Sequence, residues 1–228
     1  MGEMVEFASN GSTAGGYLAS APGGAGLGVL VIQEWWGLVP HIIDVCDRFA
    51  AEGFTALAPD LYHGKKVPNA EPDEAQKSAM GLDSERAARD MGGAVDYLGA
   101  HPAVRGQGLG VVGFCMGGGL ALWLATLRPD AIRAAVPFYG VPRGDEPDWS
   151  KLEGAVEGHY AENDELAGYE VARKLETSLT DLGKEVRIFL YPNTGHAFFN
   201  DTRPEAYDEE AARQAWVRTL EFLRAKLG

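Results

Sequence analysis

Cysteine is scarce in this chain, whose 228 residues include only Cys46 and Cys115. Two cysteines cannot build a disulfide framework, and they form no cluster with the spacing of a zinc site. We therefore expect no disulfide and no metal centre. In a reducing cytosol both side chains would be free thiols.

Positive charge is also in short supply. Lysine and arginine together number 20 against 33 aspartates and glutamates, which gives a formal net charge of −13 at pH 7. A surface this acidic repels phosphate backbones and anionic lipids, so we expect no nucleic acid and no membrane among the partners. The net charge says little about a small substrate, because such a molecule responds to the local field of its site.

Long apolar runs are absent as well. The longest, AGLGVLVI at 25–32, is far shorter than the ~20 residues that a transmembrane helix needs. The first residues lack the basic segment and apolar stretch of a secretory signal peptide, so we expect a cytoplasmic protein. The length suits one α/β domain over 1–228, or two small ones. The choice between monomer and homodimer stays open.

What the chain does contain is an alternation of apolar, β-branched runs with segments of helical periodicity. We predict strands over residues 27–33, 54–60, 108–114, 132–140, 155–164 and 185–192. We predict helices over residues 40–53, 84–101, 116–127 and 165–179, and a last helix that begins after Pro204. This order favours a mostly parallel central sheet with helices on both faces. The polar stretch 62–82 is predicted to be a long irregular loop, typical of a lid or a binding loop.

The segment GFCMGGG at 113–119 places Cys115 between a predicted strand and a predicted helix. A sharp turn of this kind, flanked by glycines, is the nucleophile elbow, which presents a strained and exposed nucleophile. The backbone N–H of Met116 would then donate to a developing oxyanion. The helix 116–127 is apolar nearly all round, so we expect it to be buried. The alternative interpretation is a glycine-rich helix start with a core cysteine.

Enzymes with this elbow place the nucleophile, the acid and the base in that order along the chain. Asp164 follows a predicted strand and is the best candidate for the acid, although Glu162 and Glu165 compete with it. Of the five histidines, His196 alone has the right order and lies in a loop after a strand. The sequence therefore predicts a triad of Cys115, Asp164 and His196. A solvated loop acid is the alternative for each carboxylate.

Glu34 directly follows the predicted strand 27–33, so it should lie at the sheet edge where ligands bind in open α/β folds. A carboxylate beside a thiol disfavours the thiolate, but it could accept the thiol's proton once substrate arrives. The alternative is an ordinary surface glutamate. The N–H of Trp35 would be the second oxyanion donor. Cys46 lies on the apolar face of its helix, and we expect it in the core.

Six motifs together resemble those of the dienelactone hydrolase family of α/β-hydrolases. They are VIQEWWG, APDLYHG, VGFCMGG, FYG, AENDE and TGHAFF, and the resemblance runs from about Glu6 to Leu227. It implies an α/β-hydrolase fold and an enzyme that cleaves an ester or lactone, similar to carboxymethylenebutenolidase, without a cofactor. Other possible functions are a general small-acyl carboxylesterase and a non-enzymatic protein that binds a ligand or senses oxidation through its thiol.

The resemblance also implies roles for single residues. Cys115 would be the nucleophile with Asp164 and His196 as its partners, and the carboxylate of Glu34 would form a hydrogen bond with the resting thiol. The amides of Trp35 and Met116 would form the oxyanion hole. Tyr139, Trp36 and Phe198 are candidate substrate-binding residues, with plain core packing as the alternative for each.

One part of the family pattern is missing. The prototype enzyme holds the carboxylate of its lactone with a pair of arginines, one after DLY and one four residues beyond the catalytic histidine. Here the first stretch reads DLYHGKK, and the second position is Asn200. Lys65, Lys66 or Arg203 could substitute, although lysine and arginine are not equivalent at such a site. We therefore expect a preference for neutral or weakly charged substrates.

Overall fold

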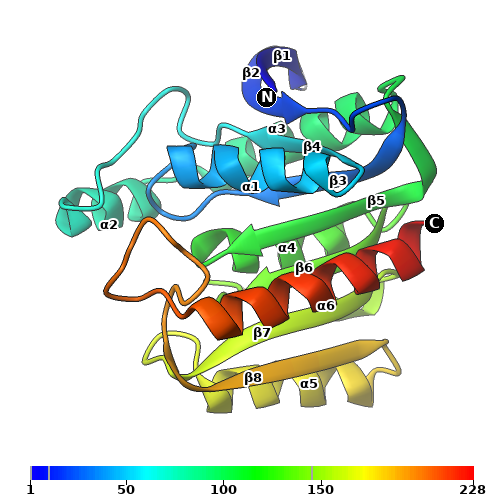
Figure 1. The fold of residues 1–228 in the computed structure, drawn as a ribbon. Helices are drawn as coiled ribbons and strands as arrows, with labels where there is room; N and C mark the ends of the chain where they lie inside the picture. The colour runs from blue at the N-terminus through cyan, green and yellow to red at the C-terminus, as the bar shows by residue number, and fades with distance from the viewer. Residues whose placement is uncertain (1, 10, 145) are drawn as a thin grey trace.

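The computed structural model describes residues 2–9, 11–144 and 146–228, which form one eight-stranded sheet with helices on both sides (Figure 1). The strands are β1 (Glu3–Ser9), β2 (Ser12–Ala19), β3 (Gly26–Ile32), β4 (Phe54–Pro59), β5 (Val104–Phe114), β6 (Ile132–Phe138), β7 (Ala155–Asn163) and β8 (Val186–Gly195). Their order in the sheet is β1-β2-β4-β3-β5-β6-β7-β8. Strands β3 to β8 run parallel, and β1 and β2 join them antiparallel at one edge.

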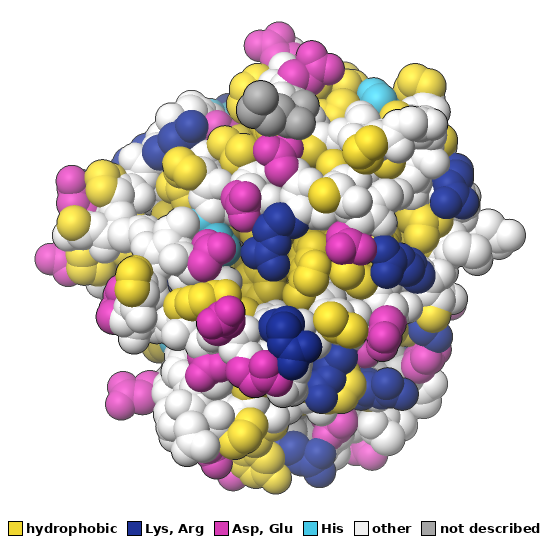
Figure 2. Space-filling model, viewed as in Figure 1, with side chains coloured by type: hydrophobic (Ala, Val, Ile, Leu, Met, Phe, Trp, Pro, Cys, Tyr) yellow, Lys and Arg dark blue, Asp and Glu magenta, His cyan; other side chains and the backbone are white. Residues whose placement is uncertain are grey.

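The helices lie in two layers. They are α1 (Pro40–Ala51), α2 (Pro72–Met80), α3 (Ser84–Gly99), α4 (Met116–Leu127), α5 (Tyr169–Asp181) and α6 (Glu209–Leu227). Helices α1 and α6 cover the front face of the sheet in Figure 1, and α3, α4 and α5 cover the back. The predicted mostly parallel sheet with helices on both faces is therefore confirmed. Over α1 and α6 the surface mixes acidic and basic side chains (Figure 2).

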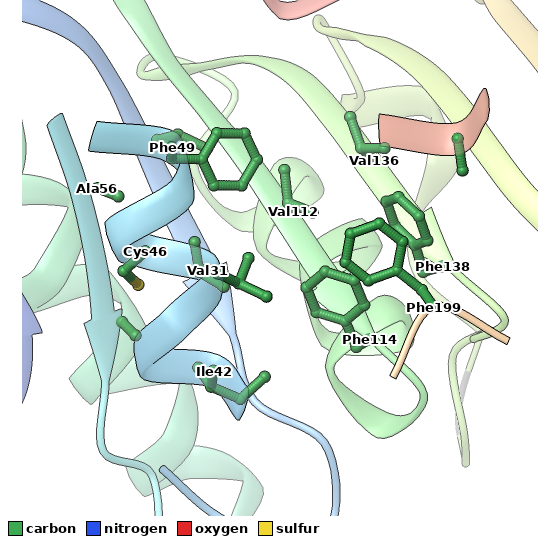
Figure 3. Close-up of a cluster of buried hydrophobic side chains, with 14 of the residues drawn as sticks. Val31, Ile42, Cys46, Phe49, Ala56, Val112, Phe114, Val136, Phe138 and Phe199 are labelled. Carbon is green, nitrogen blue, oxygen red and sulfur yellow. The ribbon is translucent and has the colours of Figure 1, made fainter. Parts of the chain in front are cut away.

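Each face of the sheet has its own hydrophobic core. On the α1–α6 side, Phe114 and Phe138 at the ends of β5 and β6 lie against Phe199, at centroid distances of 5.3 and 4.9 Å (Figure 3). Cys46 of α1 belongs to the same core and is completely buried, as predicted. Burial on both faces explains why the parallel strands are almost continuously apolar. The aromatic cluster lies at the carboxyl ends of the strands and so underlies the loops that follow them.

Every predicted strand is present, with its ends shifted by a few residues. The helix predicted over 165–179 begins later, at Tyr169. The reason is that the side chain of Asp164 accepts hydrogen bonds from the N–H groups of Leu166 and Ala167 and holds these residues in a turn. The helix predicted after Pro204 begins at Glu209.

Two predictions on helices are wrong. The stretch 62–82 is not irregular throughout, because it contains α2, which buries only Ala75 and therefore has no apolar periodicity to reveal it. Helix α4 is not buried all round. Leu120 and Trp123 are half-buried and Leu127 is 44% exposed, so this side of the helix is only partly covered. The edge hairpin of β1 and β2 was not predicted.

Two further findings concern the described residues alone. None of their helices combines the length and the apolarity needed to cross a membrane. Nor do their histidine, cysteine, aspartate and glutamate side chains gather in groups of three or more that could hold a metal ion.

Helix α3 packs unusually close to the edge hairpin. A Cβ atom built on Gly93 would lie 2.3 Å from the carbonyl oxygen of Ala8, whereas one built on the neighbouring Gly92 would meet nothing within 4 Å. Beside this contact, Asp90 accepts a 2.5 Å hydrogen bond from the Ser9 hydroxyl. Gly93 therefore permits a backbone contact that fixes β1 to the rest of the sheet.

We predict opposite effects for alanine at these adjacent positions. Gly93→Ala should lower the free energy of unfolding by about 1–3 kcal/mol, because the new methyl group forces α3 and β1 apart. Gly92→Ala should raise it by about 0.5–1 kcal/mol, because alanine favours the helix and nothing obstructs it. Urea denaturation of both variants measures the two values. Equal effects would contradict the close contact.

Candidate active site

Cys115 lies at the turn from β5 into α4, with a positive φ of 54° that non-glycine residues rarely adopt. The chain can turn this sharply only because its neighbours lack side chains. A Cβ on Gly113 would lie 1.9 Å from the carbonyl oxygen of Gly117, and one on Gly117 would lie 2.4 Å from that of Ile32. Strain of this kind is typical of functional positions. The Cys115 residue is 7% exposed, at the carboxyl end of the central strand.

Asp164 and His196 form a tight pair next to this turn. They follow β7 and β8, two neighbouring strands of the sheet, and Nδ1 of His196 lies 2.7 Å from Oδ2 of Asp164. The other carboxylate oxygen, Oδ1, accepts the N–H groups of Leu166 and Ala167 at 2.8 and 3.0 Å. The Asp164 side chain is completely buried. Because both of its oxygens are engaged, the carboxylate holds the imidazole ring in one orientation.

The two groups shift each other's protonation. Burial alone would raise the pKa of Asp164, but the hydrogen bonds from His196, Ala167 and Leu166 outweigh it and lower the pKa. Burial alone would likewise lower the pKa of His196. The hydrogen bond to Asp164, together with the influence of the nearby Cys115 side chain and the charges of both groups, outweighs burial and raises that pKa to about 10. The ring of His196 therefore lies between a carboxylate and the thiol, and its protonated form stabilises a thiolate.

Glu34 is 1% exposed, so the interpretation as an ordinary surface residue is wrong. Its Oε2 accepts a 2.8 Å hydrogen bond from Nδ2 of Asn200, and its Oε1 accepts a longer one of 3.4 Å from the Tyr139 hydroxyl. Oδ1 of Asn200 accepts from the backbone N–H and the hydroxyl of Thr202, which fixes the amide so that its NH₂ group faces Glu34. Among the described residues, the hydrogen bonds to the Glu34 carboxylate thus come from these two side chains and not from Cys115.

The predicted aromatic residues divide into two groups. Tyr139 is completely buried, and its ring lies 5.1 Å from that of His196, between centroids. Burial, followed by the charges of Glu34 and Cys115, raises the pKa of its phenol. Phe198 packs behind Tyr139 at 5.5 Å and is also completely buried, which makes it part of the core. Trp36 packs with Val67 and Ala75 beneath α2, and Trp35 lies half-buried next to it.

The candidate cations lie in different places. Nζ of Lys65 is 2.5 Å from Oε1 of Glu74, so this side chain points to α2. The guanidinium of Arg203 lies 5.8 Å from the centroid of the Trp36 ring, and its charge counteracts the rise in the pKa of Tyr139. The structure therefore brings Arg203, rather than Lys65, to the aromatic side of the site. Lys66 is exposed.

Tyr62 is a site residue that sequence reasoning missed. Its hydroxyl donates to Sδ of Met116 at 3.7 Å, and burial followed by the charge of Cys115 raises the pKa of its phenol. The carboxylate of Asp60 holds the loop by accepting the N–H groups of Tyr62 and Gly64. The position of Tyr62 shortly after β4 could have identified it as a site residue, because side chains that follow parallel strands meet at one edge of the sheet.

Comparison with known proteins agrees with these observations. The model of the dienelactone hydrolase family matches residues 14–227. Over 233 residues that span both chains completely, the sequence is 37% identical to "Protein usf" of Aquifex pyrophilus and 33% identical to a candidate carboxymethylenebutenolidase of Aquifex aeolicus. The crystal structure of a candidate dienelactone hydrolase from Klebsiella pneumoniae has a TM-score of 0.85 at 27% identity, and the match covers 98% of this chain and 99% of that one.

Neutralising Glu34 tests whether its charge acts on the thiol. In Glu34→Gln the fraction of Cys115 present as thiolate should rise, because a buried negative charge is lost, and alkylation by iodoacetamide near neutral pH should accelerate about 3- to 10-fold. Cys46 is buried and should not react. Glu153→Gln, at an exposed position, should alkylate at the unchanged rate. Equal alkylation rates in the wild type, Glu34→Gln and Glu153→Gln would show that the charge of Glu34 does not act on the thiol.

Proposed function

Because the chain belongs to the dienelactone hydrolase family, we propose that it is a hydrolase that cleaves an ester or lactone through Cys115, His196 and Asp164. The observation that carries this proposal is the position of His196, whose ring interacts with the buried carboxylate on one side and with the elbow thiol on the other. A binding protein has no need of all three groups in this arrangement. The active enzyme would be a single catalytic domain over 1–228, located in the cytoplasm, where its thiols stay reduced.

In the first half of the reaction, His196 takes the proton of Cys115 and the thiolate attacks the acyl carbon of the substrate. The carbonyl oxygen becomes an oxyanion, held by the N–H groups of Met116 and Trp35. Met116 is the first residue of α4, so its N–H has no acceptor within the helix. Collapse of this intermediate breaks the bond to the leaving oxygen, which receives the proton from His196, and leaves a thioester on Cys115.

In the second half, His196 takes a proton from water, and the resulting hydroxide attacks the thioester carbon. The carbon–sulfur bond breaks, the acid is released and the proton of His196 returns to the thiolate. Asp164 keeps the ring oriented and stabilises its positive charge in both halves. Glu34 has a different role: its negative charge disfavours the free thiolate before substrate arrives.

A preference for uncharged substrates follows from where the polar groups point. Asn200 stands at one position where the family prototype has an arginine, and its NH₂ group is used by Glu34. Lys65, near the other such position, is paired with Glu74. Neither side chain presents a cation to a substrate carboxylate, and the guanidinium of Arg203, beside Trp36, is paired with Glu205 at 2.9 Å. We therefore favour a general carboxylesterase for neutral esters over an enzyme for an anionic lactone.

Replacing the nucleophile tests the reaction itself. Cys115→Ala should lower kcat for p-nitrophenyl acetate by roughly 10³-fold or more, the loss found when other catalytic nucleophiles are removed. Cys46→Ala is the matched control and should turn over almost normally, since Cys46 is a residue of α1 that is completely buried in the core. Hydrolysis that survives in Cys115→Ala and disappears in Cys46→Ala would refute the assignment.

The charge preference is tested by comparing kcat/KM for a carboxylated dienelactone with that for an uncharged ester of similar size. Each missing charge-assisted hydrogen bond is worth about 1.5–3 kcal/mol, or about 10- to 150-fold. The uncharged ester should therefore be the better substrate. A clear preference for the dienelactone that disappears in Lys65→Ala or Arg203→Ala would show that these cations bind the carboxylate.

A further inference from the structure

One side of α4 is apolar and only partly covered. Met116, Leu120, Trp123 and Leu127 follow one another at intervals of three or four residues, so they line a single helix face. Met116 is buried at the active-site end, Leu120 and Trp123 are half-buried, and Leu127 is 44% exposed at the far end. The neighbouring positions on the other faces are fully buried in the core. Four large apolar side chains therefore extend outward from the residue that follows the nucleophile.

This face forms the floor of a cavity of about 630 Å³. The opposite walls are Leu82, in the turn between α2 and α3, and Val141 and Pro142, in the segment after β6. Cavities of roughly 300–1,000 Å³ with mainly apolar walls are typical of sites for small organic molecules. The volume and the lining therefore suit a small apolar ligand.

Three of the four charged side chains that line the cavity are held by neighbouring side chains, and the fourth is Arg143, in the segment after β6. Nζ of Lys151 lies 3.6 Å from Oδ2 of Asp148, and the carboxylate of Glu146 accepts a 2.9 Å hydrogen bond from the indole N–H of Trp149. A cationic ligand would have to break the contacts of Glu146 or Asp148, and an anionic ligand would meet Arg143, the one cation of the lining without an ion pair to another described residue. The floor of the cavity, by contrast, is apolar along α4. The cavity is therefore suited to an uncharged group.

Met116 connects the cavity to the turn that carries Cys115. Met116 lines the cavity and is also the residue whose backbone follows Cys115. Its sulfur contacts the hydroxyl of Tyr62 at 3.7 Å, and this phenol in turn lies close enough to Cys115 to respond to its charge. Methionine is unbranched and flexible, so its side chain can give way to a ligand that passes between the cavity and the thiol.

We propose that this cavity, the α4 cavity, binds an uncharged apolar arm of the ester while the scissile carbonyl lies at Cys115. This assignment rests on the proposed function and extends it by naming the substrate class: neutral esters with an aliphatic or aromatic arm. A small molecule suits the site better than a second copy of the chain, because α4, the turn between α2 and α3 and the segment after β6 together enclose a hollow of about 630 Å³ rather than a flat surface.

The test is the dependence of kcat/KM on chain length in two series, p-nitrophenyl esters from acetate to octanoate and alkyl acetates from methyl to octyl. In the wild-type enzyme one series should gain about fourfold per methylene, the value of burying one such group. Leu120→Trp fills the cavity and should lower the ratio of octanoate or octyl acetate to the shortest ester by about 10-fold or more. Trp123→Ala enlarges the cavity and should move the optimum to longer chains.

Leu182→Trp is the matched control, the same substitution at an exposed leucine after α5. It should leave the chain-length profile unchanged. If the enzyme hydrolyses short esters through Cys115 but neither series responds to Leu120→Trp, the assignment of the α4 cavity is wrong and the proposed function stands. If gel filtration shows a dimer that Leu120→Trp disperses without changing the profile, the face belongs to an interface and the assignment is overturned.

A binding measurement separates this inference from the reaction. Methyl ketones from 2-butanone to 2-decanone mimic esters and cannot be hydrolysed. Calorimetric titration of Cys115→Ala should show affinity that rises with chain length, and the double variant with Leu120→Trp should lose this rise. If the wild-type protein hydrolyses no ester, the proposed function fails, and the ketone titration alone decides the cavity: chain-independent or absent binding would overturn it.

Discussion

The backbone turns from β5 into α4 at Cys115, and the turn is held by contacts that leave no room for side chains. Gly113 is packed against Gly117, and Gly140, at the end of the neighbouring strand, would bring a Cβ within 2.0 Å of the carbonyl oxygen of Cys115. These contacts fix the sulfur at the carboxyl edge of the sheet. The other groups of the candidate site reach that point from the carboxyl ends of other parallel strands: Glu34 follows β3, next to β5, and His196 follows β8, at the edge of the sheet.

The two buried carboxylates of the site are stabilised differently. Asp164 accepts hydrogen bonds from two backbone N–H groups and faces His196, which can carry a positive charge. The positive imidazolium then compensates most of the negative charge of Asp164. Glu34 is held only by the neutral donors of Asn200 and Tyr139. Hydrogen bonds satisfy its oxygens without cancelling its charge, so the field of Glu34 still acts on its neighbours. In the proposed mechanism, Asp164 would therefore support the base and Glu34 would restrain the nucleophile.

Features determined by local order could be predicted from the sequence. The parallel sheet follows from the alternation of strands and helices, and the glycine-flanked turn at Cys115 follows from a short motif. The partners of Glu34 could not be predicted, because Asn200 is 166 positions away in the sequence. The motif comparison also pointed elsewhere, since the family prototype has a substrate-binding arginine at the position of Asn200. Helix α2 was missed for a different reason: it packs through Ala75 alone, so it lacks the apolar stripe by which an amphipathic helix is recognised.

Helix α4 shows where hydrophobic composition alone is ambiguous. A helix that is apolar all round is expected in the core, and for most of its residues this holds, with Ala121, Leu122 and Leu124 completely buried. Apolar side chains are equally suited to a binding surface from which a ligand excludes water when it binds. Composition cannot separate these cases, because both remove the same groups from water. What differs is the group that covers the side chains: Leu120 and Trp123 are only partly covered by the described chain and line a cavity that also includes Met116, the residue after Cys115. An enzyme whose elbow helix is apolar on every side can therefore use one side to stabilise the fold and another to bind what the nucleophile attacks.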